Sequence, residues 1–197
     1  MFTKTFLNQS VEILRQVSTD QIDGVVQLLR RTRDRGGRVF FCGSGGGAGH
    51  ASHATCDFRK LAGIECYSVT DNVSELTART NDEGWDTSYA AWLATSRLDE
   101  DDVVFVFSVG GGDVERNISV NLVNAMRHAK QVGAAVTGIV GRDGGAVAAL
   151  GDVCVLIPEV DSATVTPHTE GMQALIWHLV VSHPDLAIGR AKWESSV

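Results

Sequence analysis

The feature that most limits the fold of this 197-residue chain is a regular alternation of short apolar runs with longer segments of helical pattern. Five runs, rich in Val, Ile and Phe, are almost entirely apolar; they occupy residues 38–42, 65–69, 102–107, 134–140 and 153–157. Strands that are apolar on both faces are typical of a parallel sheet buried between two layers of helices. The sequence therefore predicts a doubly wound α/β fold with a five-stranded parallel sheet.

The first 36 residues have a different pattern, because their apolar residues recur with the period of a helix. One amphipathic stretch contains Phe6 and Leu14, and a second, containing Ile22 and Leu29, follows the capping residue Ser18. No linker or change in composition divides the remainder. We therefore expect a single domain over residues 1–197, with a helical pair at 1–36 in front of an α/β core at 37–197.

Composition and charge disfavour several classes of protein. A formal net charge of −7 argues against a chain that binds nucleic acid or an anionic membrane. The apolar runs are far shorter than the ~20 residues that span a bilayer, and the sequence begins without the apolar core of a signal peptide. None of the four cysteines forms a C-x-x-C pair, so we expect reduced thiols and a cytoplasmic location.

Two of the expected strands are followed by glycine-rich loops, at residues 43–49 and 108–113. In an open parallel sheet the ligand binds beyond the carboxyl ends of the strands, where these loops would lie. Glycine lets the backbone approach a ligand closely, and the free N–H groups of a following helix attract an anion. We expect both loops to open helices, and the presence of two favours a phosphate site over two simple turns.

The first loop also fits the loose form of a dinucleotide fingerprint, with Gly43, Gly45 and Ala48 at the required spacing and Asp71 after the next strand. Three observations disfavour that interpretation. The helix after the loop has a polar face, it carries two histidines that a pyrophosphate site does not need, and a helical pair precedes the first strand. A nicotinamide enzyme is therefore the weaker alternative.

His53 and Asp57 are four residues apart, so on a helix they share one face just after the first glycine loop. An imidazole and a carboxylate at this spacing can chelate one divalent ion or act as an acid–base pair; a surface hydrogen bond is the simpler alternative. In the final helix, expected at 167–182, His178 is either a core histidine or a ligand facing a cleft. His168 and Glu170 stand near the start of that helix, where we expect a substrate to reach them.

These motifs resemble those of the phosphoheptose isomerases, members of the sugar isomerase (SIS) domain superfamily, over nearly the whole chain. The family's Gly-Asn-Gly-Gly-Ser loop corresponds to residues 43–47. Ten residues after its first glycine the family has a zinc histidine, and four residues later a glutamate that is both zinc ligand and catalytic base; these positions are His53 and Asp57 here. The family's Asn-Asp pair corresponds to Asn81 and Asp82.

The family's final helix has a glutamine ligand and, eight residues later, a histidine that binds zinc and takes part in catalysis. Counting back from His178 places Glu170 at the glutamine position, whereas a gap near the helix start would place Thr169 there. Residues eight apart on a helix lie ~12 Å apart along its axis. Glu170 and His178 could therefore share an ion only if the helix start is irregular or if two subunits contribute.

The resemblance implies an α/β/α sandwich of flavodoxin-like topology and a homotetramer with sites at the subunit interfaces. It implies Asp57 as the base and His178 as the acid. A Zn²⁺ ion would be held by His53, Asp57, Glu170 and His178. The sugar phosphate would be bound by Ser44, Gly45, Gly46, Asp57, Asn81, Asp82, Ser108 and Glu170.

The chain departs from the family at several positions. Asp57 replaces a glutamate, which shortens the reach of the base by one methylene, and Glu170 replaces a glutamine, which adds negative charge. Of the family's phosphate loop, Ser-Thr-Ser-Gly-Asn-Ser, only the first serine remains, as Ser108, and Asp113 falls where a phosphate is expected. Binding of the phosphate would then depend more on backbone N–H groups, with help from Arg116 or Ser119.

The resemblance implies conversion of D-sedoheptulose 7-phosphate to D-glycero-D-manno-heptose 7-phosphate through an enediol. Two alternatives stay open. An isomerase of the same chemistry could act on a hexose or octose phosphate or in secondary metabolism, which the altered phosphate loop favours. A non-catalytic sugar-phosphate-binding protein could use the same domain, although zinc bound at His53 would be hard to explain in a simple sensor.

Overall fold

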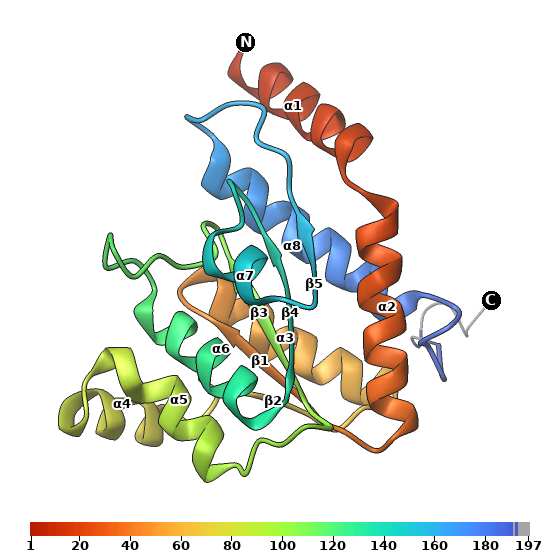
Figure 1. Cartoon of the computed structure of the whole chain (residues 1–197). Coiled ribbons are helices and arrows are strands. Elements are labelled where there is room, and N and C mark those ends of the chain that lie inside the picture. The colour runs from red at the N-terminus through yellow and green to blue at the C-terminus, as the bar shows by residue number, and fades with distance from the viewer. Residues whose placement is uncertain (191, 193–197) are drawn as a thin grey trace.

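The structure, a computed structural model, describes residues 1–190 and 192. Its centre is a parallel sheet of five strands in the order β2-β1-β3-β4-β5 (Figure 1). The strands are β1 (Val39–Gly43), β2 (Cys66–Ser68), β3 (Val103–Ser108), β4 (Ala135–Val140) and β5 (Val153–Leu156). The predicted fold is confirmed, and every strand lies within one residue of its predicted bounds.

Helices alternate with the strands along the chain. They are α1 (Phe2–Gln16), α2 (Thr19–Asp34), α3 (Gly46–Leu61), α4 (Val73–Asp82), α5 (Trp85–Thr95), α6 (Val120–Val132), α7 (Gly145–Leu150) and α8 (Val165–Ser182). The predicted N-terminal pair is α1 and α2, and Ser18 caps α2 by accepting a hydrogen bond from the backbone N–H of Gln21. The final helix begins two residues earlier than predicted, at Val165.

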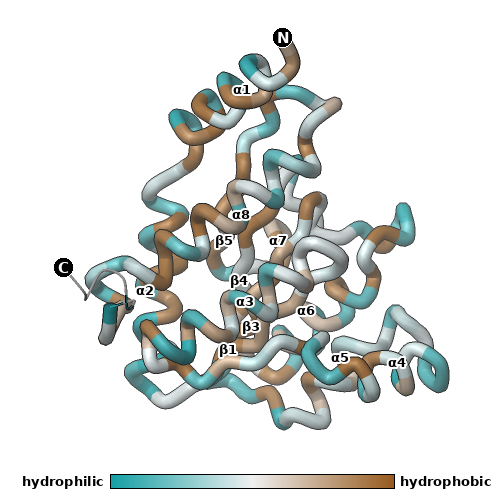
Figure 2. Tube along the Cα trace, turned by 180° about the vertical axis from the view of Figure 1, so that it is seen from behind, coloured by the Kyte–Doolittle hydropathy of each residue, from teal (hydrophilic) through white to brown (hydrophobic). Residues whose placement is uncertain are grey.

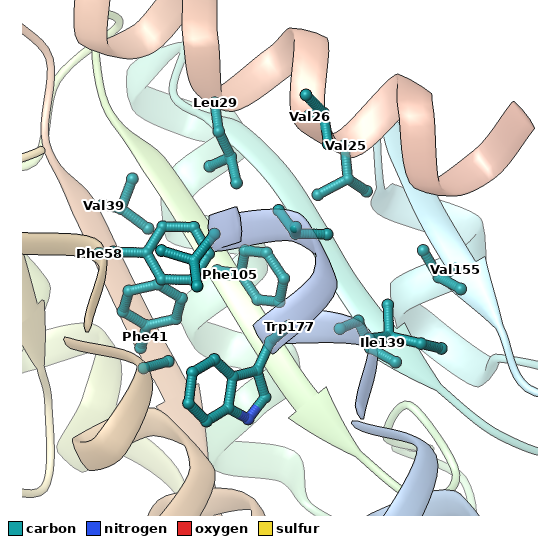
Figure 3. Close-up of a cluster of buried hydrophobic side chains, with 14 of the residues drawn as sticks. Val25, Val26, Leu29, Val39, Phe41, Phe58, Phe105, Ile139, Val155 and Trp177 are labelled. Carbon is teal, nitrogen blue, oxygen red and sulfur yellow. The ribbon is translucent and has the colours of Figure 1, made fainter. Parts of the chain in front are cut away.

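The sheet is buried on both faces because its strand residues point alternately to two helical layers. Phe41, Phe105 and Ile139 face α2, α3 and α8, where they pack with Phe58 and Trp177 (Figure 3). The intervening strand residues pack against α5, α6 and α7; they include Phe40, Val104 and Val136. This two-sided burial explains why the strands are apolar throughout rather than alternating.

The N-terminal helix α1 extends beyond the sheet and contacts the start of α8 (Figure 1). There His168 stacks on Phe6, with ring centroids 4.1 Å apart, and its Nε2 lies 3.0 Å from Gln9 Oε1. His168 is buried by these contacts, so the expectation that a substrate reaches it is wrong. Four apolar side chains of α1 are exposed, those of Phe2, Leu7, Val11 and Leu14, and apolar positions are coloured brown along the α1 trace in Figure 2.

No helix in the described part of the chain is long and apolar enough to cross a membrane.

Candidate active site

The carboxyl ends of the neighbouring strands β1 and β3 open onto a cleft of about 180 Å³. The polar part of its lining comes from the loops after these strands and from α8: Ser44, Ser108, Ser119, Glu170 and Gln173. Ile118 and Phe107 are among its apolar lining residues. This is the edge of the sheet at which an open parallel fold binds its ligand.

The first glycine loop leads directly into α3, as the sequence predicts. Gly45 caps this helix at φ 56° and ψ −122°, a conformation that is essentially restricted to glycine. At Gly46 a Cβ atom would lie 2.6 Å from the carboxyl carbon of Glu170. The Glu170 carboxylate therefore stands at the N-terminus of α3, where helix N–H groups favour a negative charge. Of the predicted substrate-binding residues, the structure gathers Ser44, Gly45, Gly46 and Glu170 here.

Two residues that sequence reasoning missed support the first loop. The Tyr89 hydroxyl of α5 donates a hydrogen bond to the Gly43 carbonyl oxygen at 2.7 Å. Asn121 of α6 is fully buried and donates from Nδ2 to Ser44 Oγ at 3.5 Å. Burial raises the pKa of Tyr89 to about 12, so its phenol stays protonated and keeps donating at neutral pH. No local pattern marks either residue, because both reach the loop only through tertiary packing.

The second glycine loop is used mainly for packing, which corrects the expectation that it opens a helix over an anion. Gly111 and Gly112 have φ values of 73° and 88°, and a Cβ atom on Gly111 would lie 1.8 Å from the carbonyl oxygen of Gly144. The carbonyl oxygens of the two glycines accept hydrogen bonds from the backbone at Val147 and Ala146. These glycines therefore let the loops after β3 and β4 lie backbone to backbone.

Helix α6 does not follow the second loop directly but begins at Val120, because the chain first forms a small turn. Asp113 and Ile118 pair through two backbone hydrogen bonds of 2.8 Å each. Within the turn, the Asp113 carboxylate accepts from the Arg116 N–H at 3.0 Å and lies 3.3 Å from Arg116 Nε. Asp113 is thus held by the turn itself, and of the two predicted phosphate helpers only Ser119 lines the cleft.

His53, Asp57 and His178 form a cluster on the facing sides of α3 and α8. Each offers one donor atom, and these atoms lie within 4.8 Å of one another. Asp57 Oδ2 lies 3.7 Å from His53 Nε2 and 3.9 Å from His178 Nε2. The side chain of His178 is 49% exposed, so the core interpretation of this histidine is wrong.

The cluster has the donor set that a zinc ion prefers, two imidazole nitrogens and a carboxylate oxygen. The Nδ1 of His178 lies 2.7 Å from the carbonyl oxygen of Ala174, an acceptor, so Nδ1 carries the proton. The Nε2 lone pair is then free on the side of Asp57, as in metal-binding histidines whose second nitrogen donates to a carbonyl. These three residues fit a divalent ion. Glu170 is not part of this cluster.

Asn81 and Asp82 lie outside the cleft. Both are exposed in the last turn of α4, where Asn81 Nδ2 donates to Asp82 Oδ1 at 2.7 Å. Thr169, the other residue considered for the glutamine position, is buried, and its Oγ1 would lie 2.4 Å from a Cβ atom on Gly141.

Gln173, which sequence reasoning did not single out, lies in the floor of the cleft. It is one turn after Glu170 on α8, and this spacing is the only signal that could have found it. Its Nε2 donates to the carbonyl oxygens of Ser108 and Ile139, at 3.1 and 2.8 Å. Gln173 therefore ties α8 to the carboxyl ends of β3 and β4.

A family model for the SIS domain matches residues 5–141. The chain belongs to the SIS domain family. It is 35% identical over 187 residues to the lincomycin biosynthesis protein LmbN of Streptomyces lincolnensis, an alignment that covers 91% of this chain and 68% of that protein. It is 31% identical over 162 residues to the phosphoheptose isomerase of Rhodospirillum rubrum, covering 80% of this chain and 79% of the relative.

Solved structures of low identity share the fold. The phosphoheptose isomerase GmhA of Neisseria gonorrhoeae superposes with a TM-score of 0.78 at 22% identity, over 91% of this chain and 94% of the other. The NanR protein of Vibrio vulnificus, solved with ManNAc-6P, superposes with a TM-score of 0.62 at 11% identity, over 94% of this chain and 64% of the other. The family assignment and the curated relatives together indicate that the chain is an aldose–ketose isomerase of the phosphoheptose isomerase type.

Proposed function

We propose that this isomerase converts D-sedoheptulose 7-phosphate to D-glycero-D-manno-heptose 7-phosphate through an enediol. The observation that carries the proposal is the cluster of His53, Asp57 and His178 on the two helices that also border the cleft. A heptulose phosphate carries its phosphate and its carbonyl at opposite ends of an extended carbon chain. That separation suits a site with anion-binding groups at one end and a carboxylate–imidazole cluster at the other.

In this proposal Asp57 is the base and His178 is the acid. The Asp57 carboxylate takes a proton from the carbon beside the carbonyl, and His178 donates a proton from Nε2 to the carbonyl oxygen, which gives the enediol. Asp57 then returns its proton to the neighbouring carbon, and the proton of the other hydroxyl passes back to His178 Nε2, which gives the aldose and restores both groups. The Nε2 of His178 faces the same space as Asp57 Oδ2, 3.9 Å away, and this nitrogen can either carry the acid proton or bind the ion proposed below, but not both at once.

We propose Zn²⁺ as the cofactor, held by His53, Asp57 and His178. When bound, such an ion would polarise the substrate oxygens and stabilise negative charge on the enediolate. Glu170 is the fourth ligand that the resemblance implies. Because its carboxylate lies against Gly46 in this chain, it would join a metal site only if a second subunit supplied it.

The phosphate would be bound at the N-terminus of α6, by Ser119 and Ser108 together with the helix N–H groups. The Ser108 hydroxyl accepts a hydrogen bond from the Gly111 N–H at 3.0 Å, and its own proton is left to donate to a ligand. Ser44, Gly45, Gly46 and Glu170 would bind the sugar. Like charge keeps the phosphate away from the first loop, where the Glu170 carboxylate already stands at a helix N-terminus.

We also propose a homotetramer with its sites at the subunit interfaces. Leu175 and Leu179 are exposed on α8 on either side of His178 in sequence, and α1 has an exposed apolar side. Exposed apolar side chains around a functional group are typical of an interaction surface. Asn81 and Asp82, exposed at the end of α4, would reach a site only across such an interface.

A cytoplasmic location is part of the proposal. The four cysteines are free thiols, and two of them, Cys42 and Cys66, are buried in the sheet. Burial raises the pKa of both thiols, which keeps them protonated and unreactive.

A second candidate is an isomerase of the same chemistry that acts on another sugar phosphate, such as an octose phosphate. The turn at residues 113–118 favours it, because this turn brings the apolar side chain of Ile118 into the lining of the cleft. The similarity to a lincomycin biosynthesis protein points in the same direction. A non-catalytic sugar-phosphate sensor is less well supported, because the His53–Asp57–His178 cluster would have no purpose in it.

The test is incubation of the purified chain with ketose phosphates of six, seven and eight carbons, with and without a chelator, followed by NMR of the products. We expect aldose formation from sedoheptulose 7-phosphate, its loss with chelator and its recovery with added Zn²⁺. Turnover of only the hexulose or octulose phosphate would select the second candidate. Binding of these compounds without turnover of any would refute the isomerase.

A further inference from the structure

Gln173 is a buried amide whose orientation is fixed by its surroundings. Its Nε2 group has two hydrogens, and two carbonyl oxygens, those of Ser108 and Ile139, lie at hydrogen-bond distance. Rotating the amide by 180° would place Oε1 against both of these oxygens, so hydrogen bonding decides which end is which. Oε1 therefore points away from the strand ends as an acceptor.

That acceptor has no hydrogen-bond partner among the described residues, and it is out of contact with bulk solvent. A buried oxygen without a donor is costly, and most such atoms in folded proteins are paired. Gln173 lines the cleft together with Glu170, one helical turn before it. The floor of the cleft thus holds an acceptor that needs a donor.

We infer that Gln173 binds the sugar, its Oε1 accepting a hydrogen bond from a hydroxyl group of the ligand in the cleft. The inference rests on the proposed function in that it takes the ligand to be a polyhydroxylated phosphate. It adds a specificity-determining residue that neither the motifs nor the resemblance assigned.

The polarity of the cleft also sets the direction of the ligand. Glu170 and Gln173 present acceptor oxygens on the α8 side, which attract hydroxyl protons and repel an anion. Ser119 and the N-terminus of α6 present donors, which suit a phosphate that carries about two negative charges at neutral pH. The sugar hydroxyls therefore lie over α8 and the phosphate over α6.

The first experiment uses the wild-type chain labelled with ¹³C and ¹⁵N in its glutamine side chains. The Gln173 signals are assigned by their absence from the Gln173→Met spectrum. The probe is glucitol 6-phosphate, an open-chain polyol phosphate that has no carbonyl and cannot be isomerised, and inorganic phosphate is the control ligand. We expect the Gln173 Cδ resonance to move with the polyol phosphate and to stay in place with inorganic phosphate.

Three results would overturn the assignment: equal movement with inorganic phosphate, no movement of Gln173 while backbone amides around Ser119, observed in a second, uniformly ¹⁵N-labelled sample, report binding of the polyol phosphate, or no binding of it at millimolar concentration. Equal movement with inorganic phosphate would mean that the partner of Oε1 is a buried water displaced on binding and not a sugar hydroxyl. Movement of Gln173 together with no turnover of any ketose phosphate would refute the isomerase and leave this assignment standing.

The second experiment compares Gln173→Met with a matched control, Gln21→Met. Gln21 also uses its side chain to hold a backbone group, because its Oε1 accepts from the Leu156 N–H at 3.0 Å, but it is not among the cleft residues. Gln173→Met should weaken binding of glucitol 6-phosphate roughly three- to tenfold, the range for one lost hydrogen bond. Binding of inorganic phosphate should stay within twofold, and Gln21→Met should leave both unchanged. An equal loss for both ligands would show a structural role only.

Discussion

The two glycine loops have almost the same composition and serve different purposes. In the first loop, Gly45 has positive φ but a Cβ atom there would meet no atom within 4 Å, and Gly46 faces a carboxylate. In the second loop, Gly111 is pressed against the carbonyl oxygen of Gly144. At Gly45 glycine is needed for backbone conformation and at Gly46 for the approach of a carboxylate, whereas at Gly111 it is needed for contact between two backbones. Gly43 and Gly47 make such backbone contacts within the first loop as well.

This difference divides the site into two parts. The first loop starts α3, the helix that carries His53 and Asp57, so the reaction chemistry proposed above would lie on that side. On the second side the loop itself is a packing element, and the cleft residues Ser108 and Ser119 flank its glycines. We therefore expect substitutions on the first side to affect turnover, and those on the second side to affect stability or phosphate affinity.

The largest effect should come from Gly111→Ala. A Cβ atom there would lie 1.8 Å from the Gly144 oxygen at a φ of 73°, so the loops after β3 and β4 would have to separate. We expect the free energy of unfolding to fall by more than about 4 kcal/mol, measured by urea titration. Gly45→Ala, which has positive φ but open space, should lose less, about 1–3 kcal/mol for its strained backbone conformation. Equal losses in the two variants would remove the distinction between the loops.

Next in size is the effect of Asp57→Asn on turnover. Loss of the proposed base should lower kcat by about 10²–10⁴-fold, the range for general acid–base catalysis. The urea midpoint should stay close to that of the wild type, because Asp57 lies at a partly exposed position of α3. Asp23→Asn, an exposed carboxylate of α2, is the control and should keep full activity. Near-normal turnover of Asp57→Asn would contradict the assignment of the base.

A smaller effect is expected at Ser119, which lines the cleft at the start of α6 with a φ of 50°. Ser119→Ala and Ser119→Gly both remove the hydroxyl and should weaken inorganic phosphate binding about three- to tenfold, measured by calorimetry. The free energy of unfolding should be higher for Ser119→Gly than for Ser119→Ala, because only glycine adopts the positive φ without strain. Unchanged phosphate affinity in both variants would move the phosphate site away from α6.

The smallest effect concerns the pH dependence of stability at His50, on the first turns of α3. Burial lowers the pKa of His50, against the opposing influence of the nearby Glu170 carboxylate. The folded chain then favours neutral imidazole, so this contribution to stability is complete above about pH 6.5, the ordinary histidine value, and is lost as pH falls below it. Between pH 7 and pH 5, the midpoint temperature of thermal unfolding should fall more steeply for the wild type than for His50→Gln. Parallel curves would contradict this expectation.

Local periodicity accounts for the parts of the fold that were predicted. A buried parallel strand must be apolar on both faces, so the five runs marked the strands to within one residue. The spacing of His53 and Asp57 placed them on one helix face, because the geometry of a single helix turn does not depend on its neighbours. The first glycine loop was likewise predicted correctly as the start of a helix.

Other features depend on contacts that no local pattern encodes. The delayed start of α6 follows from the pairing of Asp113 with Ile118, and the shape of the second loop follows from Gly144, more than 30 residues later. His168 was expected to be accessible because it is a polar residue near the start of the final helix, but α1 covers it. Tyr89 and Asn121 reach the first loop, and Gln173 reaches the cleft, from helices whose patterns are ordinary.

By itself, the sequence determined the strands, the first loop and the pairing of His53 with Asp57, because each depends on residues within one or two helical turns. The resemblance implied that His178 joins this pair, and the tertiary structure brings the three side chains together. Only the tertiary structure decided that Glu170 stands instead at Gly46 and that Gln173 lines the cleft. Helix α8 follows α3 by more than 100 residues, and its rotation and position are set by packing of side chains such as Trp177 in the shared core. That packing is a property of the assembled layers, which no short stretch of sequence contains.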